Sequence, residues 1–425
     1  MRILIITHYF PPLNSIASLR PYSWAKYWTM AGHEVTVLTT TKLTTSIDVN
    51  FPVSDFKVIS VNCRTSLSKP NNSVGKAKIK KKSWFRRILS KYITKTGTIL
   101  NDARFPNMFQ LWIIPAIKKI ETEQPFDITV ATYAPFAAFI IAKKLKKKGV
   151  TKKVVLDYRD LWIENHISSG IPFFWFYEKY LENKICKTAD FVITVSEPLA
   201  DKLEEKTHIK RVSVIPNGFD VMDLKNLSSE KFFKNGFFNI VFTGSYYANL
   251  VNPIPLFEAV KQLKDKSFIG LDKMRIYFAG ARVEELDKLA QQYNLEQYIH
   301  CVGFVPRENA LKMQRDADVL LFLESDFSQI DGILTGKLFE YMFSKTHIWT
   351  IGKKWQPSRM IEEFKLGKAL GNDVQLIKKE LINLLQGNIP PKNDISNIRE
   401  LQKYTREYQA NELLKIMKEI LENKK

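Results

Sequence analysis

One segment of the sequence combines a strand, a glycine and two charged side chains at a spacing that suits phosphate chemistry. Within ADVLLFLESDFSQIDGILTGKLFEYM, residues 317–342, we predict a buried strand at 319–323 and a helix that opens at Lys337. Gly336 lets a ligand approach the backbone closely, and the first amides of a helix attract an anion. Glu340, one turn inside the helix, can accept hydrogen bonds from a vicinal diol such as that of a ribose. The segment therefore predicts a site for a nucleoside diphosphate.

The two charged residues of this segment also have simpler explanations. A carboxylate near the start of a helix stabilises it by complementing the helix dipole, whatever else it binds. Lys337 is either the positive charge that a departing diphosphate needs or a solvated surface charge. Arg282 is the second candidate for that positive charge.

A second group of charged residues follows a predicted strand in the N-terminal half. The motif DYRDLW contributes Asp157, Arg159 and Asp160. Asp160 can hold a sugar hydroxyl or orient an attacking group, and Arg159 can bind phosphate. Asn14 and Arg20, in and after the loop that follows the first strand, are expected at the same edge. A buried structural Asp–Arg pair is the alternative.

Two parallel sheets are needed to position these residues. Strand-like runs rich in Val, Ile and Thr, typical of parallel strands covered on both faces, occur in two series separated by amphipathic segments. The runs are 2–8, 33–40, 127–132, 153–158 and 191–196, then 239–244, 275–280, 300–305, 318–324 and 347–352. The predicted fold class is α/β, with two doubly wound Rossmann-like domains whose strands end at a central cleft. Gly244 with Ser245, and Gly280, stand at strand ends there; tight turns are the alternative role of the glycines.

The expected domains are an N-terminal unit at 1–216, a C-terminal unit at 217–393 and a final helix within 394–425. Asn217-Gly218 signals a turn at the first boundary.

Composition narrows the class of protein. The 425 residues carry a formal charge of +20, and the 33 basic and 17 acidic residues of 1–210 account for +16 of it. An acidic partner would therefore meet the N-terminal half.

The three cysteines, Cys63, Cys186 and Cys301, have no zinc or disulfide spacing, which favours a reducing cytoplasm. The start MRILIITHYFPP is interpreted as a strand rather than a signal peptide, and no run approaches the roughly 20 apolar residues of a membrane span.

Five segments, in order, resemble the GT-B type glycosyltransferases of family 4, which retain the donor configuration, and in particular a bacterial surface-polysaccharide subgroup. They are HYFPP with the run after it, DYRDLW, ADFVITVSEPLADKL with VSVIPNGFD, VGFVPRENALKMQRDADVLL, and GKLFEYM. GKLFEYM matches the family's helix that carries its second glutamate, here Glu340. Two departures are visible: Gly332 stands where the family has its first glutamate, and SYYANLVNPIPL lacks the family's Arg and Lys.

The resemblance implies a set of site residues and no cofactor or metal. Backbone at Phe304 and Val305 would contact the base, and the final helix would return to the first domain. The implied donor-binding residues are Gly244, Ser245, Arg282, Phe304, Val305, Gly336, Lys337, Leu338 and Glu340. The implied acceptor-side residues are Asn14, Arg20, Arg159 and Asp160, and the implied catalytic residues are Asp160, Lys337 and Glu340.

The implied activity is retaining, metal-independent transfer from a nucleoside diphosphate sugar, with UDP favoured, to a lipid-linked oligosaccharide. The product would serve bacterial capsule, O-antigen or exopolysaccharide synthesis, with a hexosyl or N-acetylhexosaminyl group transferred. Passage through an oxocarbenium-like state, with the donor phosphate taking the acceptor proton, requires no strong protein base. A nucleotide-sugar epimerase of the same architecture and a catalytically idle sugar-nucleotide-binding protein, suggested by Gly332, are the alternatives. Nucleic-acid binding rests on charge alone and is not expected.

A basic insertion at 56–101 contains 12 Lys or Arg and no acidic residue. Residues 84–95, taken as a helix, place Trp84, Phe85, Ile88, Leu89, Tyr92 and Ile93 on one face and basic residues mainly on the other. We expect residues 76–95 to bind an anionic membrane surface, so that the protein is cytoplasmic and peripheral on the inner face of the bacterial inner membrane. The alternative is that the apolar face packs on the N-terminal domain.

Overall fold

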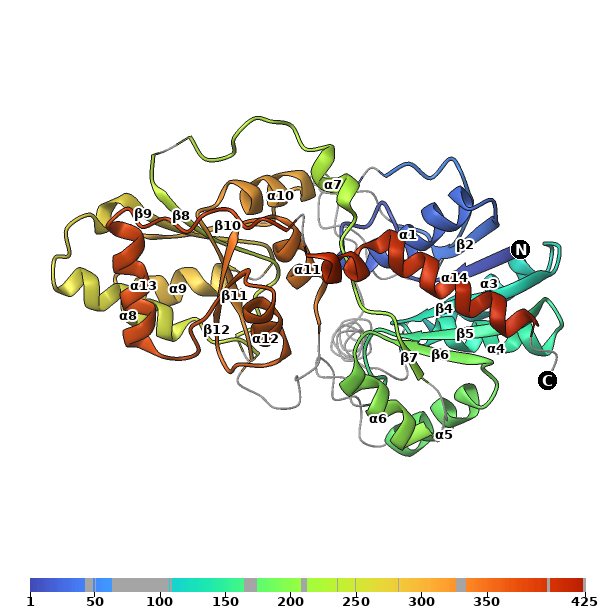
Figure 1. The fold of residues 1–425 in the computed structure, drawn as a ribbon. Helices are drawn as coiled ribbons and strands as arrows, with labels where there is room; N and C mark the ends of the chain where they lie inside the picture. Colours follow the sequence, from blue (N-terminus) through green and yellow to red (C-terminus); the bar gives the residue numbers. More distant parts are fainter. Residues whose placement is uncertain are drawn as a thin grey trace, which may run out of the picture.

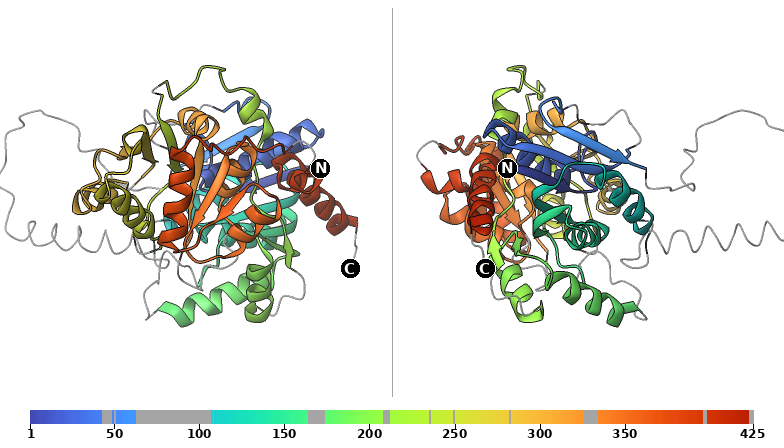
Figure 2. Two further views of the ribbon diagram at one scale, coloured as in Figure 1. Left: turned by 60° about the vertical axis from the view of Figure 1, so that its left-hand side comes forward. Right: turned by 90° about the vertical axis from the view of Figure 1, so that its right-hand side faces the viewer.

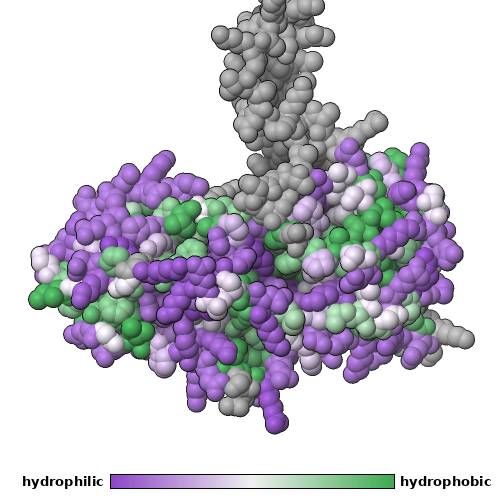
Figure 3. All heavy atoms as spheres, turned by 90° about the horizontal axis from the view of Figure 1, so that it is seen from above, coloured by the Kyte–Doolittle hydropathy of each residue, from purple (hydrophilic) through white to green (hydrophobic). Residues whose placement is uncertain are grey.

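The structure is a computed structural model with two α/β domains side by side (Figure 1). It describes residues 1–42, 49, 51–62, 107, 109–163, 174–207, 212–234, 236–248, 250–281, 283–325, 334–395 and 398–422. In space-filling form, hydrophilic residues cover most of the face shown, with smaller groups of hydrophobic residues between them (Figure 3). Within the described ranges, no helix is both long and apolar enough to cross a membrane.

The N-terminal domain is built on a parallel sheet with the strand order β3-β2-β1-β4-β5-β6-β7. Its strands are β1 (Arg2–Ile6), β2 (Glu34–Thr40), β3 (Lys57–Val61), β4 (Phe126–Tyr133), β5 (Thr151–Tyr158), β6 (Phe191–Thr194) and β7 (Val212–Val214). The central strands are almost wholly buried because helices cover both faces of the sheet. One face packs α3 (Gln110–Ile120), α4 (Ala137–Lys147), α5 (Trp175–Cys186) and α6 (Glu197–Thr207). The other face packs α1 (Ile16–Met30) and α14 (Arg406–Glu422).

The C-terminal domain repeats this plan on a sheet with the order β10-β9-β8-β11-β12-β13. Its strands are β8 (Phe238–Thr243), β9 (Met274–Ala279), β10 (Ile299–Gly303), β11 (Val319–Leu323), β12 (His347–Ile351) and β13 (Gly367–Ala369). One face packs α8 (Ile254–Asp265), α9 (Glu284–Gln292) and α13 (Val374–Leu385). The other packs α10 (Arg307–Asp316), α11 (Gly336–Phe343) and α12 (Gln356–Glu363). Short 3-10 turns lie at η2 (Leu271–Lys273) and η4 (Arg399–Tyr404).

The chain passes between the domains twice, and the two passages lie side by side. The first leads into the short helix α7 (Val221–Lys225), and the second joins η4 to α14. Phe219 donates its amide to the Tyr404 carbonyl at 3.0 Å, and Arg406 donates its amide to the Phe219 carbonyl at 3.0 Å. α14 then lies along the N-terminal domain (Figures 1 and 2), where Trp28 Nε1 donates to the Ala410 carbonyl at 2.8 Å.

The predicted fold class is confirmed, with differences at the edges. β3, β7 and β13 were not predicted: β7 and β13 are three-residue edge strands, and β3 lies at the start of the basic insertion. The donor-side helix begins at Gly336, one residue before the predicted start. The predicted single helix from 394 is wrong, because Thr405 is extended where the chain crosses between the domains. Most of the basic insertion, including residues 76–95, lies outside the described residues.

Candidate functional site

Two glycines lie against each other at the carboxyl edge of the second sheet. Gly244 follows β8 with φ 129°, and Gly280 follows β9 with φ 146°, a backbone region that favours glycine. A Cβ placed on Gly280 would lie 2.1 Å from the carbonyl oxygen of Gly244. This close packing is by itself a sufficient reason for a glycine at position 280.

Lys337 extends from the start of α11 across Gly244. Its Cδ lies 3.3 Å from where a Cβ on Gly244 would stand. Its Nζ lies 4.0 Å from the ring centre of Phe242 and 5.1 Å from that of Phe322. Part of the side chain stays accessible to solvent, but burial lowers the pKa of its ammonium to about 7, against the raising effect of Glu340. Lys337 is therefore not an ordinary solvated surface charge.

Glu340 is buried one turn further along α11, and its carboxylate is shared by two donors. Arg307 Nη1 donates to Oε1 at 2.6 Å, and Gln314 Nε2 donates to Oε2 at 3.3 Å. Arg307 begins α10 and also donates to Asp223 Oδ2 at 2.8 Å. Burial disfavours the charge on Arg307, but Glu340 and Asp223 outweigh it and raise the pKa. Glu340 thus forms a buried ion pair within the C-terminal domain rather than merely complementing the dipole of α11.

Sequence reasoning missed Arg307, which connects the donor-side helix to the interdomain segment. Asp223, its second partner, lies on α7. Asp220, the residue immediately before α7, caps that helix and accepts hydrogen bonds from Lys26 at 2.8 Å and Tyr27 at 2.9 Å. A chain of charged groups therefore runs from α11 through α10 and α7 to α1. Arg307 lies within VGFVPRENALKMQRDADVLL, one of the five segments that resemble the family. Its partners, Glu340 and Asp223, are 33 and 84 residues away in the sequence, so the pairing could not be predicted from it.

Arg20 does not occupy the acceptor-side position predicted for it. Its guanidinium is buried and donates to Asp157, from Nε to Oδ2 at 3.2 Å and from Nη2 to Oδ1 at 2.9 Å. Nη1 donates to the Pro216 carbonyl at 2.8 Å, and Trp24 stacks on the guanidinium at 4.8 Å. Two-point pairing and stacking satisfy this side chain inside the domain. Arg20 and Asp157 therefore form a buried structural ion pair.

The other predicted acceptor-side residues remain at the surface edge of the N-terminal sheet. Arg159 is half-buried; its Nε donates to the Tyr133 carbonyl at 2.7 Å, and its guanidinium lies 5.3 Å from the ring centre of Tyr9. Asp160 and Asn14 are also half-buried. His8, at the end of β1, is neutral because burial, with Lys42 and Arg159 nearby, lowers its pKa to about 3.

The two halves of the site meet where α11 begins opposite α1. A Cβ on Gly336 would lie 2.7 Å from Ile16 Cδ1, so the glycine leaves room for this side chain of the other domain. Asn217 Nδ2 donates to the Leu334 carbonyl at 3.1 Å in the same region. The start of α11 is therefore held directly against the first residue of α1.

The remaining residues predicted to bind the donor differ in their exposure to solvent. Ser245 is exposed beside Gly244, while Phe304 is exposed and Val305 is half-buried after β10. The Leu338 side chain is wholly buried in the core beneath α11, so it faces away from the edge. Arg282 and Gly332 lie outside the described residues.

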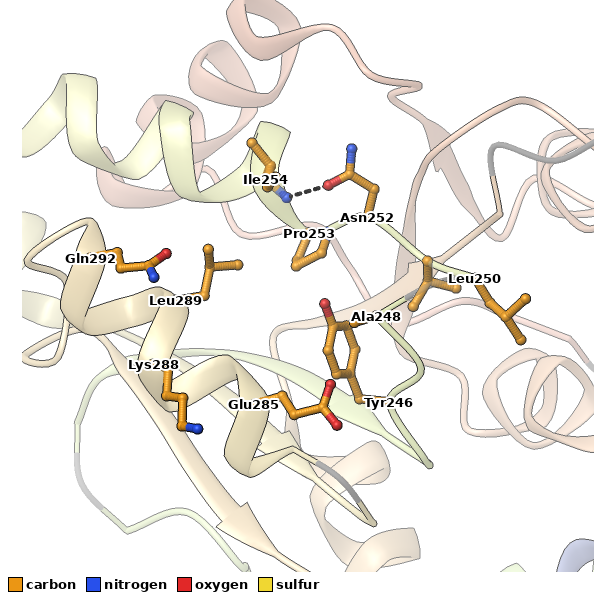
Figure 4. Close-up of a pocket in the computed structure, with 11 residues that line it drawn as sticks. Tyr246, Ala248, Leu250, Asn252, Pro253, Ile254, Glu285, Lys288, Leu289 and Gln292 are labelled. Carbon is orange, nitrogen blue, oxygen red and sulfur yellow. Dashed lines mark hydrogen bonds between the residues drawn. The ribbon is translucent and has the colours of Figure 1, made fainter. Parts of the chain in front are cut away.

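A cavity of about 540 Å³ opens beside the segment that follows Ser245. Tyr246 and Glu285 point into the space between the start of α8 and α9, and Pro253 and Leu289 stand on opposite sides of it (Figure 4). Burial and the neighbouring Glu285 raise the pKa of Tyr246, which keeps the phenol neutral. The described residues do not gather three or more His, Cys, Asp or Glu side chains into a possible metal site.

Comparison with known proteins agrees with this geometry. Residues 21–222 match the family described as Glycosyltransferase Family 4. No curated protein matches the chain in sequence. Among solved structures, a glycosyltransferase from Rickettsia africae ESF-5 superposes with a TM-score of 0.61 at 17% identity, covering 99% of both chains.

Two further structures share this architecture. Sucrose-phosphate synthase from Thermosynechococcus elongatus has a TM-score of 0.65 at 14% identity, covering 99% of this chain and 98% of its own. The lipopolysaccharide outer core galactosyltransferase WaaB has a TM-score of 0.54 at 12% identity, covering 99% of both chains. At these identities the likeness concerns the fold. Residues 21–222 are therefore similar to glycosyltransferase family 4, and the whole chain has the GT-B fold of these structures.

Proposed function

We propose that the protein is a retaining, metal-independent glycosyltransferase that moves a sugar from a nucleoside diphosphate, with UDP favoured, to a lipid-linked oligosaccharide. The transferred group is a hexosyl or N-acetylhexosaminyl residue. The product serves bacterial capsule, O-antigen or exopolysaccharide synthesis, and the enzyme works on the cytoplasmic face of the inner membrane.

The observation that carries the proposal is the meeting of Gly244, Lys337 and the start of α11 at one sheet edge, opposite the other domain. The glycine leaves backbone open to close approach, the start of α11 is the positive end of a helix dipole, and the ammonium of the lysine can gain or lose a proton near neutral pH. Each of these favours a diphosphate. A diphosphate that gains negative charge as the sugar leaves is stabilised there more than the intact donor.

The nucleoside would extend from this point toward Glu340 and the segment after β10. Glu340 accepts hydrogen bonds from Arg307 and Gln314, and a carboxylate with two oxygens has lone pairs left for ribose hydroxyls. Arg307 then acts as a positioning residue, because its hydrogen bond fixes the rotamer of Glu340. The base would rest near Phe304 and Val305.

The acceptor would approach from the N-terminal domain, past Asp160, Arg159 and Asn14. In the proposed reaction the acceptor hydroxyl enters on the face from which the diphosphate leaves, and the donor phosphate takes its proton. The bond from the anomeric carbon to the donor oxygen breaks as the bond to the acceptor oxygen forms. The two domains hold the two reactants close together and correctly oriented, and this is their main contribution to the reaction rate.

A thermal-shift screen of UDP, GDP and their sugars tests the donor half of the proposal. A ligand at one hundred times its dissociation constant stabilises the folded state by about 2.7 kcal/mol, a measurable rise in Tm. We expect a UDP-sugar to give the largest rise. Free nucleoside diphosphate should then form only when acceptor is added; formation of an epimer without acceptor would favour an epimerase. Donor binding without turnover on every acceptor would favour an idle binding protein.

A further inference from the structure

A second concave surface of the C-terminal domain lies outside the proposed donor site. Lys337 and Glu340 are carried by α11, which packs on one face of the sheet. The cavity beside Tyr246 opens on the opposite face, where α8 and α9 cover the sheet and the Tyr246 ring belongs to their core. Different elements therefore build the cavity and the proposed donor site.

The walls of this cavity are fixed by hydrogen bonds of the protein itself. The Tyr246 amide donates to the Ala281 carbonyl at 2.9 Å, which holds the start of the segment that leads to α8. The Asn252 side chain accepts a hydrogen bond from the Ile254 amide at 3.0 Å, which holds the end of that segment (Figure 4). The volume of about 540 Å³ lies within the range of about 300 to 1,000 Å³ that is usual for small-molecule sites. The cavity is therefore a preformed site of suitable size.

Three polar side chains reach this cavity, and none has a hydrogen-bond or ion-pair partner in the part of the chain that the structure describes. Tyr246 is 5% exposed, and its hydroxyl points into the open space. The Glu285 carboxylate and the Gln292 amide extend into the same space from α9 (Figure 4). A carboxylate accepts hydrogen bonds, whereas a phenol and a primary amide both donate and accept them. The three groups together suit a ligand with several hydroxyl groups.

The remaining walls are apolar, and the cavity has no excess of either charge. Pro253 and Leu289 stand on opposite sides of the space (Figure 4). Glu285 and Lys288, which both line the cavity, carry opposite charges. A phosphate would meet a carboxylate there without a surplus of positive charge, so an anionic ligand is disfavoured. A sugar ring fits this combination, because its hydroxyl groups bond to polar side chains while its C–H face packs on apolar ones.

We propose that this cavity binds a neutral sugar unit, separately from the nucleotide sugar. Glu285, Tyr246 and Gln292 hold its hydroxyl groups. Pro253 and Leu289 pack against its ring. The sugar unit has two possible sources, the oligosaccharide acceptor or a free saccharide that acts as an effector. The first source rests on the proposed function, whereas the binding of a saccharide does not.

Ligand-observed NMR on the full chain tests this site with neutral probes: glucose, galactose, N-acetylglucosamine, maltose, lactose and chitobiose. We expect at least one probe to bind with millimolar affinity, and saturating UDP to leave its binding unchanged. Tyr246→Phe with Glu285→Gln should weaken that binding about tenfold or more. The matched control, Tyr293→Phe with Glu284→Gln, makes the same chemical changes on α9 and at its end, outside the cavity lining, and should leave binding unchanged.

Three results would overturn the proposal: no probe binds, UDP displaces the bound probe, or the two double variants lose the same affinity. Equal unfolding temperatures establish that both variants are folded. Gln292→Ala, at an exposed position, repeats the test if the cavity variant unfolds at a lower temperature.

The KM for the oligosaccharide acceptor identifies the source of the sugar unit. A rise in this KM at unchanged kcat in the cavity variant assigns the site to the acceptor, and an unchanged KM assigns it to a free saccharide. Probe binding without any glycosyl transfer would contradict the proposed function alone. Transfer without probe binding would contradict the saccharide site alone.

Discussion

Lys337 is the residue whose protonation should respond most to the donor. In the ligand-free protein burial lowers its pKa to about 7, so the ammonium is mostly charged at pH 6 and mostly neutral at pH 9. A bound diphosphate favours the charged form and raises this pKa. Donor binding at pH 8 should therefore take up a proton, and affinity should weaken as pH rises above 7.

Titration calorimetry of the nucleoside diphosphate in buffers of different ionisation enthalpy measures this uptake. We expect close to one proton at pH 8 for the unchanged protein and none for Lys337→Met. Proton uptake that persists in Lys337→Met would assign it to another group and remove the lysine from the site.

Glu340→Gln separates recognition of the ribose from packing, because the amide keeps the shape of the carboxylate. Loss of a charge-assisted hydrogen bond to a hydroxyl costs about 1.5 to 3 kcal/mol, so donor affinity should fall about ten- to a hundredfold. Glu308→Gln is the matched control, since that side chain is exposed next to Arg307 and pairs only with Lys312 in the described structure. Equal donor affinity of the two variants, both folded, would contradict the role given to Glu340.

At the residue scale the sequence indicated which types of side chain were present but not their partners. Lys337 and Glu340 were predictable because strand, glycine and helix are adjacent in the chain. Arg20 was misplaced because its partner, Asp157, is 137 residues away. A charged residue beside a predicted cleft has the same local pattern whether it faces solvent or a buried carboxylate.

Among the elements, the starts of α11 and α1 are in contact and join the two domains. Gly336→Ala should push its new Cβ against Ile16, because a Cβ at this position would lie only 2.7 Å from Ile16 Cδ1. Overpacking of this kind costs about 1 to 3 kcal/mol, and we expect kcat/KM to fall about five- to a hundredfold. Ile16→Ala in the same protein should restore most of the loss.

The double substitution is what makes this experiment specific. If Ile16→Ala does not restore activity to Gly336→Ala, the glycine serves the backbone or the ligand rather than the interdomain contact. If Gly336→Ala has no effect, the domains are not held together at this point during turnover.

The strands show which elements a sequence pattern can reveal. Long, buried strands such as β4 and β11 were predicted because a run of β-branched and apolar residues covers both faces. β13 has the sequence GKA, which is too short to show an alternation of buried and exposed residues. It is recognisable only by its pairing with β12. β3 alternates buried and exposed residues, but its lysine-rich surroundings hid the pattern.

For the whole molecule, the C-terminal helix ties the second domain to the first. Leu413 is wholly buried in the core of the N-terminal domain, although it follows the C-terminal domain in sequence. Leu413→Ala should lower the free energy of unfolding by about 2 to 5 kcal/mol. Tyr408→Ala, at an exposed position on the same helix, should change it by about 0.5 kcal/mol or less. Chemical denaturation measures both, and similar values for the two would show that α14 is not part of that core.

The central claim concerns acceptor-dependent transfer from a nucleoside diphosphate sugar, and one measurement addresses it most directly. Protein and a labelled UDP-sugar are incubated with and without lipid-linked oligosaccharide, while free UDP and label in the lipid fraction are followed together. We expect UDP and lipid-bound label to appear in equal amounts, only with acceptor, and with the anomeric configuration of the donor. UDP release that does not depend on acceptor, or an inverted linkage, would contradict the account.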